Sequence, residues 1–256
     1  MKKLMILLIV LISFHVVIAK EIQASEGTSH MILIPPENPY YPMPILEYDF
    51  NHDSQVEYLI PFTNEKYNEY GVSLWLKSEH TGIKKWETKQ RGIGLSYSAL
   101  VDLTGDDVKE YLFGVKIGAS AGNILSVFER KGNHLEKRAE WNYHMIEPFE
   151  GGIALWDRIL ADAYIVDVLK WNGEKFVFDE QLFSEYYPTI EIFYKEKIQK
   201  LDAWFYWYAL ADAQIKANEI QKARNSINYG ISLAEQLGMP DVVDKFKDFK
   251  EQVQNH

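Results

Sequence analysis

The sequence predicts an α+β fold in which an antiparallel β part comes first and a helical part follows. Short runs of alternating apolar and polar residues, separated by turn residues, fill positions 46–180. From about Tyr187 onward, apolar residues instead recur every three to four positions, as on one face of an α-helix. Because strands and helices are segregated along the chain, a doubly wound α/β sheet is not expected.

The composition is that of an acidic globular protein without cysteine. Of 256 residues, 47% are hydrophobic and 25% are charged, and the formal net charge is −10. A chain this long can bury one large core or two smaller ones. Nucleic acid is not an expected partner, because phosphate neutralisation needs clustered lysine and arginine. The absence of cysteine excludes disulfides, thiolate metal sites and cysteine nucleophiles.

The first 19 residues have the pattern of a secretory signal peptide. Lys2 and Lys3 precede an almost wholly apolar run at 4–19, which is shorter than the roughly 20 residues that span a bilayer. Cleavage is expected after Ala19, with a second site after Ala24. An uncleaved membrane anchor is the alternative. A cleaved signal predicts an extracytoplasmic protein, secreted or associated with the cell envelope, without a membrane span after signal removal.

Residues 20–45 and 46–183 are expected to differ in structure. The first stretch is rich in proline, which excludes a helix or a central strand and predicts an extended lead-in. In the second, a β domain, Asn172-Gly173 predicts a hairpin with a type I′ turn. Examples of the expected strands of this domain are Glu57–Ile60, Gly71–Lys77, Leu95–Val101, Glu110–Ile117, Ile124–Glu129, Tyr164–Trp171 and Lys175–Phe178.

Residues 184–256 are expected to form a helical domain. Pro188 can begin the first helix, because a first-turn proline loses no needed hydrogen bond, and this helix should reach about residue 200. Two further helices follow, and Gly238 and Pro240 should end the second of them. A last short helix starts near Val242.

Two acidic loops in the β domain share one pattern and lie 53 residues apart. In each, oxygen-bearing side chains alternate, a glutamate closes the loop, and an aromatic residue opens an apolar strand. A chain that coils around Ca²⁺ presents every second side chain inward, and this ion takes about six to eight oxygens. The candidate ligands are Asp49, Asn51, Asp53, Gln55 and Glu57 in the first loop and Asp102, Thr104, Asp106, Val108 and Glu110 in the second, with Gln55 and Val108 contributing backbone carbonyls.

Gly105 favours the second loop as the better calcium site, because glycine permits a tight turn. The alternative is that both loops are acidic turns without an ion, since Asp, Asn and Gly dominate turns in general.

The second loop and its strand resemble the FG-GAP/VCBS repeats of integrin-α-type β-propellers. In that family an Asp-rich loop leads into an apolar strand that ends in glycine, and residues 102–114 follow this pattern. Residues 49–60 match less closely, because Pro61 replaces the glycine. The resemblance covers about residues 46–180. It implies two or three blades of about four strands in an open arrangement, calcium as a structural ion, and extracellular recognition.

The helical part resembles a single tetratricopeptide repeat over about residues 204–237. The family places a small residue on each of two helices where they touch, and Ala211 and Ala223 match those positions. Asn218 stands at the turn between the helices, where the family usually has glycine, and asparagine also tolerates the left-handed conformation. Gln214 departs from the usual aromatic residue. One repeat cannot bury its own face, so it should lean on neighbouring helices or on the β domain.

No motif predicts catalysis. The histidines show no paired helical spacing and no H-E-x-x-H, and Gly94–Ser98 fails the G-x-S-x-G pattern at its last position. A pair of carboxylates set in space stays an open alternative. The aromatic run Trp204–Tyr208 covers every face of its helical turn, which favours a place between two packed surfaces. The alternative is an exposed patch that binds peptide or glycan.

Together these patterns predict an exported, non-enzymatic recognition or scaffolding protein at the bacterial cell surface. Its expected partner is a protein or peptide, with cell-wall glycan as a further candidate, and Ca²⁺ is its expected structural ion. The alternative, from a different class, is a secreted hydrolase of wall glycan or peptide. A deep pocket with two carboxylates or a Ser–His pair would favour the hydrolase.

Overall fold

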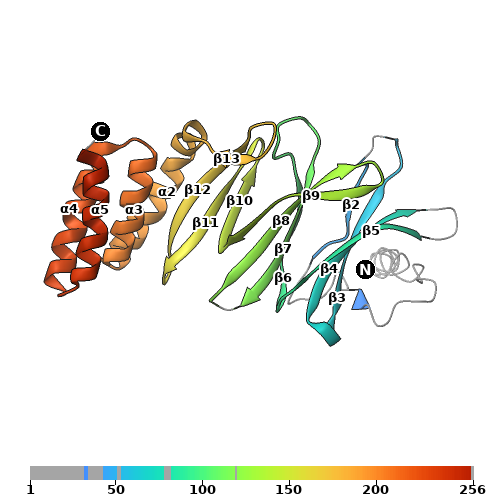
Figure 1. Ribbon diagram of the computed structural model, residues 1–256, viewed down its shortest axis with the longest axis horizontal. Helices are drawn as coiled ribbons and strands as arrows, with labels where there is room; N and C mark the ends of the chain where they lie inside the picture. The colour runs from blue at the N-terminus through green and yellow to red at the C-terminus, as the bar shows by residue number, and fades with distance from the viewer. Residues whose placement is uncertain (1–31, 34–42, 51–52, 78–81, 119, 255–256) are drawn as a thin grey trace, which may run out of the picture.

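The computed structural model describes residues 32–33, 43–50, 53–77, 82–118 and 120–254. The predicted signal peptide and most of the proline-rich lead-in lie outside these residues. Within them the fold is α+β, as the sequence predicts: antiparallel sheets come first and four helices follow. Figure 1 shows the sheets in chain order along the long axis, with the helices beyond the last sheet.

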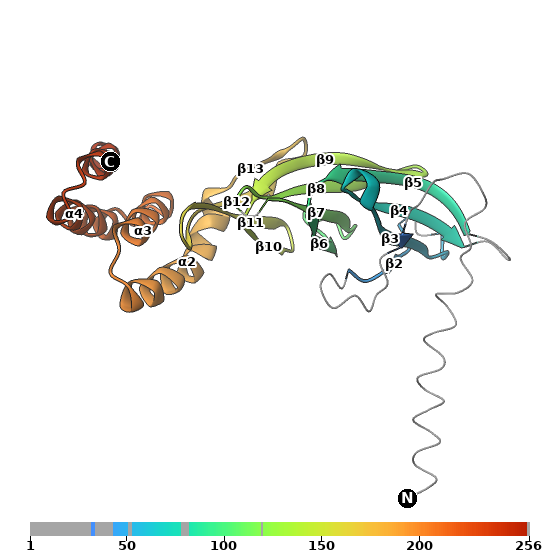
Figure 2. The same cartoon turned by 90° about the horizontal axis from the view of Figure 1, so that it is seen from below.

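Three antiparallel sheets make up the described β part, and from β2 onward consecutive strands within each sheet pair. In Figure 2, the strands β2, β6 and β10 lie along one side of the row and β5, β9 and β13 along the other. In the first sheet, β1 and β2 both pair with β3. The strands are β1 (Ile32–Leu33), β2 (Leu46–Tyr48), β3 (Glu57–Asn64), β4 (Glu69–Lys77) and β5 (Gly82–Arg91) in the first sheet; β6 (Gly94–Val101), β7 (Glu110–Gly118), β8 (Gly122–Lys131) and β9 (His134–Tyr143) in the second; and β10 (Met145–Phe149), β11 (Gly152–Leu160), β12 (Ala163–Trp171) and β13 (Phe176–Phe178) in the third.

Alternate side chains of the inner strands pack against opposite neighbours. In β7, Tyr111 and Phe113 belong to the core between the first and second sheets, whereas Leu112 belongs to the core between the second and third. In β11, Leu155 lies in that second core and Trp156 lies in the core against the helices. Because both faces of these strands are apolar, each sheet that contains them needs a layer on either side.

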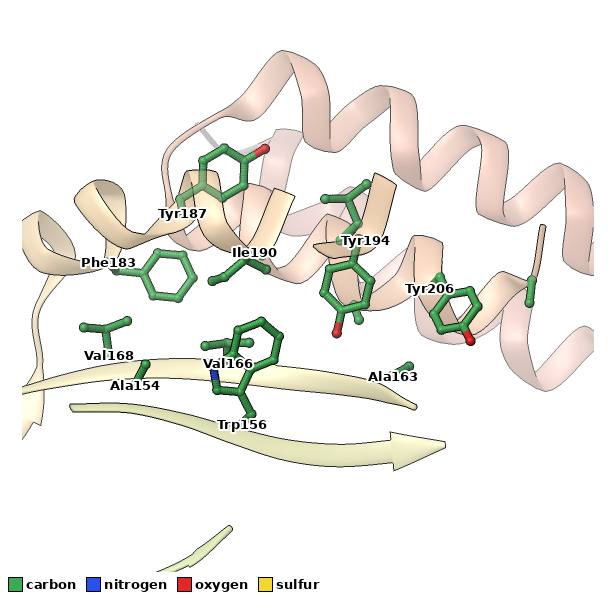
Figure 3. Close-up of a cluster of buried hydrophobic side chains, with 14 residues drawn as sticks. Ala154, Trp156, Ala163, Val166, Val168, Phe183, Tyr187, Ile190, Tyr194 and Tyr206 are labelled. Atoms are coloured by element: carbon green, nitrogen blue, oxygen red, sulfur yellow. The ribbon is translucent and has the colours of Figure 1, made fainter. Parts of the chain in front are cut away.

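The helices are α2 (Glu180–Lys200), α3 (Trp204–Lys216), α4 (Ile220–Gln236) and α5 (Pro240–Gln254). α2 and α3 cover the third sheet, where Trp156 and Val166 face Phe183, Ile190 and Tyr194 (Figure 3). The third sheet and the helices therefore share one core, which crosses the predicted boundary at 183/184. None of the described helices is long and apolar enough to cross a membrane.

Polar contacts at the β11–β12 turn also fix the helices on the third sheet. Asp162 in this turn accepts hydrogen bonds from Lys197 of α2 and Tyr206 of α3. The hydrogen bond from Lys197, reinforced by the one from Tyr206, holds the pKa of Asp162 below its usual range. Tyr194 of α2 donates its hydroxyl to the carbonyl of Tyr164 in β12.

The predicted start of the first helix at Pro188 is wrong, because α2 begins at Glu180 and contains Pro188 in its interior. Asp179 caps the helix by accepting the backbone N–H of Leu182 at 2.8 Å, which satisfies one of the free donors of the first turn. A proline inside a helix costs about 3 kcal/mol. Pro188 lies on the exposed face of α2, where the backbone carbonyl that lost its N–H donor can bind water. Tyr187 beside it is buried in the core.

The two predicted helix ends are confirmed. Asn218 has a left-handed φ of 58°, and the N–H of Glu219 donates to the carbonyl of Gln214 at 2.8 Å. Gly238 has a φ of 65° and ends α4 in the same way. This arrangement pairs carbonyls that the last helical turn leaves without a donor.

The predicted hairpin at Asn172-Gly173 is confirmed, but its turn type is wrong. β12 pairs with β13 across the four residues 172–175, and of the two residues only Gly173 has a positive φ, at 97°. The side chain of Asn172 instead accepts the backbone N–H groups of Glu174 and Lys175, at 3.0 and 2.9 Å. This side-chain turn replaces the type I′ turn.

Ala223→Leu should destabilise the helical part. Ala211 of α3 and Ala223 of α4 are both 0% exposed and belong to the core that α3, α4 and α5 share. A leucine at this position has no space, and overpacking typically costs about 1–3 kcal/mol. The melting temperature of the helical circular-dichroism signal should fall. Asn225→Leu, on the exposed side of the same helix, is the matched control and should melt like the natural chain. Equal melting temperatures of the two variants would show that the contact between α3 and α4 does not need a small residue at position 223.

Candidate cation-binding loops

The two acidic loops occupy equivalent places in the first and second sheets. Residues 49–56 join β2 to β3, and residues 102–109 join β6 to β7. In the third sheet the same place is a short turn at Glu150-Gly151, between β10 and β11. The N–H of Gly151 donates to the carbonyl of Asp102 at 3.0 Å, so the second loop rests on the third sheet.

The first aspartate of the second loop organises the loop backbone. Asp102 Oδ1 accepts the N–H of Gly105 at 2.6 Å, and Oδ2 accepts that of Asp107 at 2.8 Å. Asp106 Oδ1 in turn accepts the N–H of Val108 at 2.9 Å. Gly105 has a φ of 76°, which agrees with the tight turn that its identity predicts.

The first loop repeats this pattern 53 residues earlier. Asp49 accepts the N–H groups of Asp53 and Ser54 at 3.1 and 2.9 Å, and Asp53 accepts that of Gln55 at 2.7 Å. Ser54 has a φ of 67° and Asp107 a φ of 68°, so the backbone turns in the same way at the same place. The predicted ligand Asn51 lies outside the described residues.

The closing glutamates also correspond. Glu57 accepts the N–H of Phe50 at 2.9 Å, and Glu110 accepts that of Leu103 at 2.8 Å. Phe50 and Leu103 are themselves buried in the two neighbouring cores. Each loop is therefore closed by one buried carboxylate and anchored by one apolar side chain that points into the protein.

The two glutamates differ in their counter-charge. Arg130 of β8 donates to the second oxygen of Glu57 at 2.7 Å, and both side chains are nearly buried. Among the described residues, the corresponding oxygen of Glu110 accepts a hydrogen bond from the hydroxyl of Thr104 alone, at 3.2 Å. Glu110 is 2% exposed, and this burial raises its pKa to about 7, against the opposing effect of its hydrogen bonds. The second loop thus holds a buried carboxylate without a cation among the described residues.

The predicted ligand set is only partly assembled. The carboxylates of Asp49, Asp53, Asp102 and Asp106 bind backbone N–H groups in their own loops, and the residues predicted to lend carbonyls, Gln55 and Val108, are seen as N–H donors. No group of three or more carboxylate or histidine side chains in the described ranges is placed to hold a metal ion. The donors are nevertheless all oxygen, which is the chemistry that Ca²⁺ prefers.

A histidine–carboxylate pair lies between the second and third sheets. His144 Nδ1 is 3.0 Å from Asp157 Oδ1 and accepts the backbone N–H of Arg158 at 3.1 Å. His144 Nε2 is 3.4 Å from the carbonyl of Ser120. Both ring nitrogens of His144 therefore have polar partners within the fold. The pair ties a turn of the second sheet to the third.

The aromatic run Trp204–Tyr208 lies between two cores. Tyr206 is buried in the core with the third sheet, whereas Trp204 and Tyr208 pack against the core of α3, α4 and α5. Trp207 contacts both cores, and its indole N–H donates to Asp202 at 2.7 Å. The interpretation as a helix between two packed surfaces is confirmed.

Comparisons with known proteins place the chain in no family: no protein-family model and no curated protein matches its sequence.

Glu110→Gln should reduce the pH dependence of stability. The pKa of folded Glu110 is raised from 4.5 to about 7, so between these values the folded state keeps a proton that the unfolded state has lost. The free energy of unfolding should therefore fall as pH rises through this window, by at most about 1.4 kcal/mol per pH unit, and level off above it. Glutamine does not titrate; its oxygen can still accept the N–H of Leu103, and its amide group can donate to the hydroxyl of Thr104. Urea unfolding in chelator across this window should give the variant the shallower slope.

Glu57→Gln is the matched control at the equivalent position. It leaves Arg130, whose side chain is 10% exposed, without its carboxylate, and breaking a buried ion pair costs about 3–5 kcal/mol. This variant should be destabilised at every pH. Equal pH slopes in the natural chain and in Glu110→Gln would contradict the assignment of a buried titrating group to the second loop.

Proposed function

We propose that this chain is an exported, non-enzymatic recognition or scaffolding protein of the bacterial cell surface. In this proposal each sheet is one blade, similar to an FG-GAP/VCBS repeat, and the blades form an open row. The helices at the end of the row act as a tetratricopeptide-like module. Such a row offers long side surfaces to a protein or peptide partner, or to cell-wall glycan, rather than one enclosed cleft.

The observation that carries the proposal is the repetition of the acidic loop. The same hydrogen bonds from backbone N–H groups to Asp49 and Asp102, and to Glu57 and Glu110, recur at the same place in two consecutive sheets. Repeats of one supersecondary unit with a shared loop are typical of extended binding proteins. The left-handed turn at Asn218 and the small residues of α3 and α4 support the tetratricopeptide-like interpretation in the same way.

Calcium is the structural ion in this proposal, and the Asp102 loop is its principal site. Arg130 already neutralises Glu57 in the first loop, whereas Glu110 lacks a cation in the described part of the chain. A divalent ion held by Asp102, Asp106 and Glu110 would supply the missing charge.

Calcium should therefore raise the melting temperature of the mature protein through the second loop. At a hundredfold excess over its dissociation constant, an ion that binds only the folded state adds about 2.7 kcal/mol. The double variant Asp102→Ala with Asp106→Ala should lose most of the calcium-dependent rise, whatever its baseline stability. The matched double variant Asp49→Ala with Asp53→Ala should keep most of it. An unchanged melting temperature of the natural chain in calcium would show that both loops are plain turns.

Recognition is tested by capture on intact cells. The mature chain, which should begin at Lys20 or Ser25 in mass spectra of the envelope or culture fraction, is fitted with a photo-crosslinker and incubated with cells in calcium or chelator. One reproducible envelope protein or glycan should be captured. Failure to capture any partner, together with cleavage of wall glycan or peptide by the purified chain, would overturn the proposal in favour of a secreted hydrolase.

A further inference from the structure

Asp202, in the connection between α2 and α3, binds one aromatic side chain from each of two helices. Its Oδ1 accepts the indole N–H of Trp207 in α3 at 2.7 Å, and its Oδ2 accepts the hydroxyl of Tyr229 in α4 at 2.6 Å. The two rings are in contact, with their centroids 4.5 Å apart and their planes at 42°. One carboxylate therefore holds two aromatic rings in a fixed place.

The surface around this carboxylate is open to solvent. Asp202 is exposed, Tyr229 is 46% exposed, and Leu201, which follows the end of α2, is 55% exposed. By contrast, Tyr194 and Tyr206 of the neighbouring helices are buried in the core with the third sheet. A ring face and an apolar side chain are thus accessible beside the carboxylate.

Asp202 differs from the other carboxylates of the helical part in its partners. Glu191 and Asp212 each pair with a lysine. No described lysine or arginine nitrogen lies within 4.0 Å of the Asp202 carboxylate, although Lys200 stands two residues before it. Asp248 also lacks such a cation, but among the described residues only Asp202 accepts hydrogen bonds from two aromatic side chains.

This arrangement suits a cation from outside the chain. A cation over the face of a tyrosine or tryptophan ring is attracted by the ring's negative face. Arginine can use the ring and the carboxylate together, because its planar guanidinium stacks on aromatic faces and donates forked N–H groups to carboxylates. The rings are already ordered by their hydrogen bonds, so less conformational entropy is lost on binding. The net charge of −10 also attracts a basic segment over a longer distance.

We propose that the surface formed by Leu201, Asp202, Trp207 and Tyr229 binds an arginine-containing segment of a partner protein. The guanidinium stacks on the exposed ring of Tyr229 and donates to Asp202, and an apolar side chain beside the arginine rests on Leu201. Complementary charge separates this partner from a neutral sugar, which can stack on the ring but leaves the carboxylate without a counter-charge. The inference rests on the proposed recognition function and adds the chemistry of the partner.

Two labelled peptides test the proposal by fluorescence anisotropy with the purified natural chain. One alternates arginine and leucine, and the other has citrulline, an uncharged analogue of similar shape, in place of each arginine. The arginine peptide should bind at least about fivefold more tightly. Its affinity should weaken with added salt, because Asp202 is exposed to solvent. Equal binding of both peptides, or tighter binding of a soluble wall-glycan fragment, would overturn the proposal.

Asp202→Asn locates the binding. Because the residue is exposed, asparagine removes the charge without opening a cavity, and it should weaken binding of the arginine peptide by about fivefold. Asp248→Asn makes the same charge change on the exposed side of α5 and should leave the affinity unchanged. This control separates a specific site from the general attraction between an acidic chain and a basic peptide. Equal effects of the two variants would show that no such site exists.

The aromatic ring is tested separately. Tyr229→Leu removes the ring but keeps an apolar side chain, and it should weaken binding by about fivefold. Tyr67→Leu, at a tyrosine between β3 and β4 that is 48% exposed, is the matched control and should bind like the natural chain. Unchanged affinity in Tyr229→Leu would contradict the proposal. If partner capture on cells persists in Asp202→Asn, only this surface is misassigned; if the natural chain captures nothing, the recognition function itself fails.

Discussion

The structure depends on layers that are apolar on both faces. Successive residues of β7 enter different cores, and so do Leu155 and Trp156 of β11. The same holds for α3, in which Tyr206 faces the third sheet and Ala211 faces α4 and α5. No such layer can stand alone in water, because one apolar face would stay exposed. The row of layers can end only at elements with one apolar face and one polar face, and α4 and α5 are such elements.

Neighbouring layers are also joined by the acidic loops, and the two junctions differ in charge. Between the first and second sheets, the buried ion pair of Glu57 with Arg130 crosses from β3 to β8. Between the second and third sheets, the loop meets its neighbour through the backbone bond from Gly151 to Asp102, and Glu110 lacks a cation partner in the described structure. The second junction therefore holds the buried carboxylate whose pKa burial raises, and in the proposed function calcium binds there.

Patterns local to the sequence predicted the order of strands and helices, the two equivalent loops and both left-handed helix ends. The strands β5, β9, β10 and β11 were not among the expected strands. β5 and β9 are edge strands with long charged side chains, and charge on an edge strand prevents association but obscures the alternation of apolar and polar residues. Pro188 was wrongly predicted to begin the helix, because its cost is offset by the burial of Tyr187 before it and Ile190 after it. The partner of Glu57 could not be predicted, since Arg130 lies 73 residues away and only the stacking of two sheets brings them together.

The central claim is that each layer that is apolar on both faces is stable only between two neighbours. Hydrogen–deuterium exchange tests it most directly, by comparing the natural chain with a chain that ends at Phe178 and so lacks all four described helices. The account predicts that β11 and β12 lose their exchange protection in the shorter chain, because Trp156 and Val166 are then exposed, while β7 keeps more of its protection. Full protection of β11 and β12 without the helices would contradict the claim.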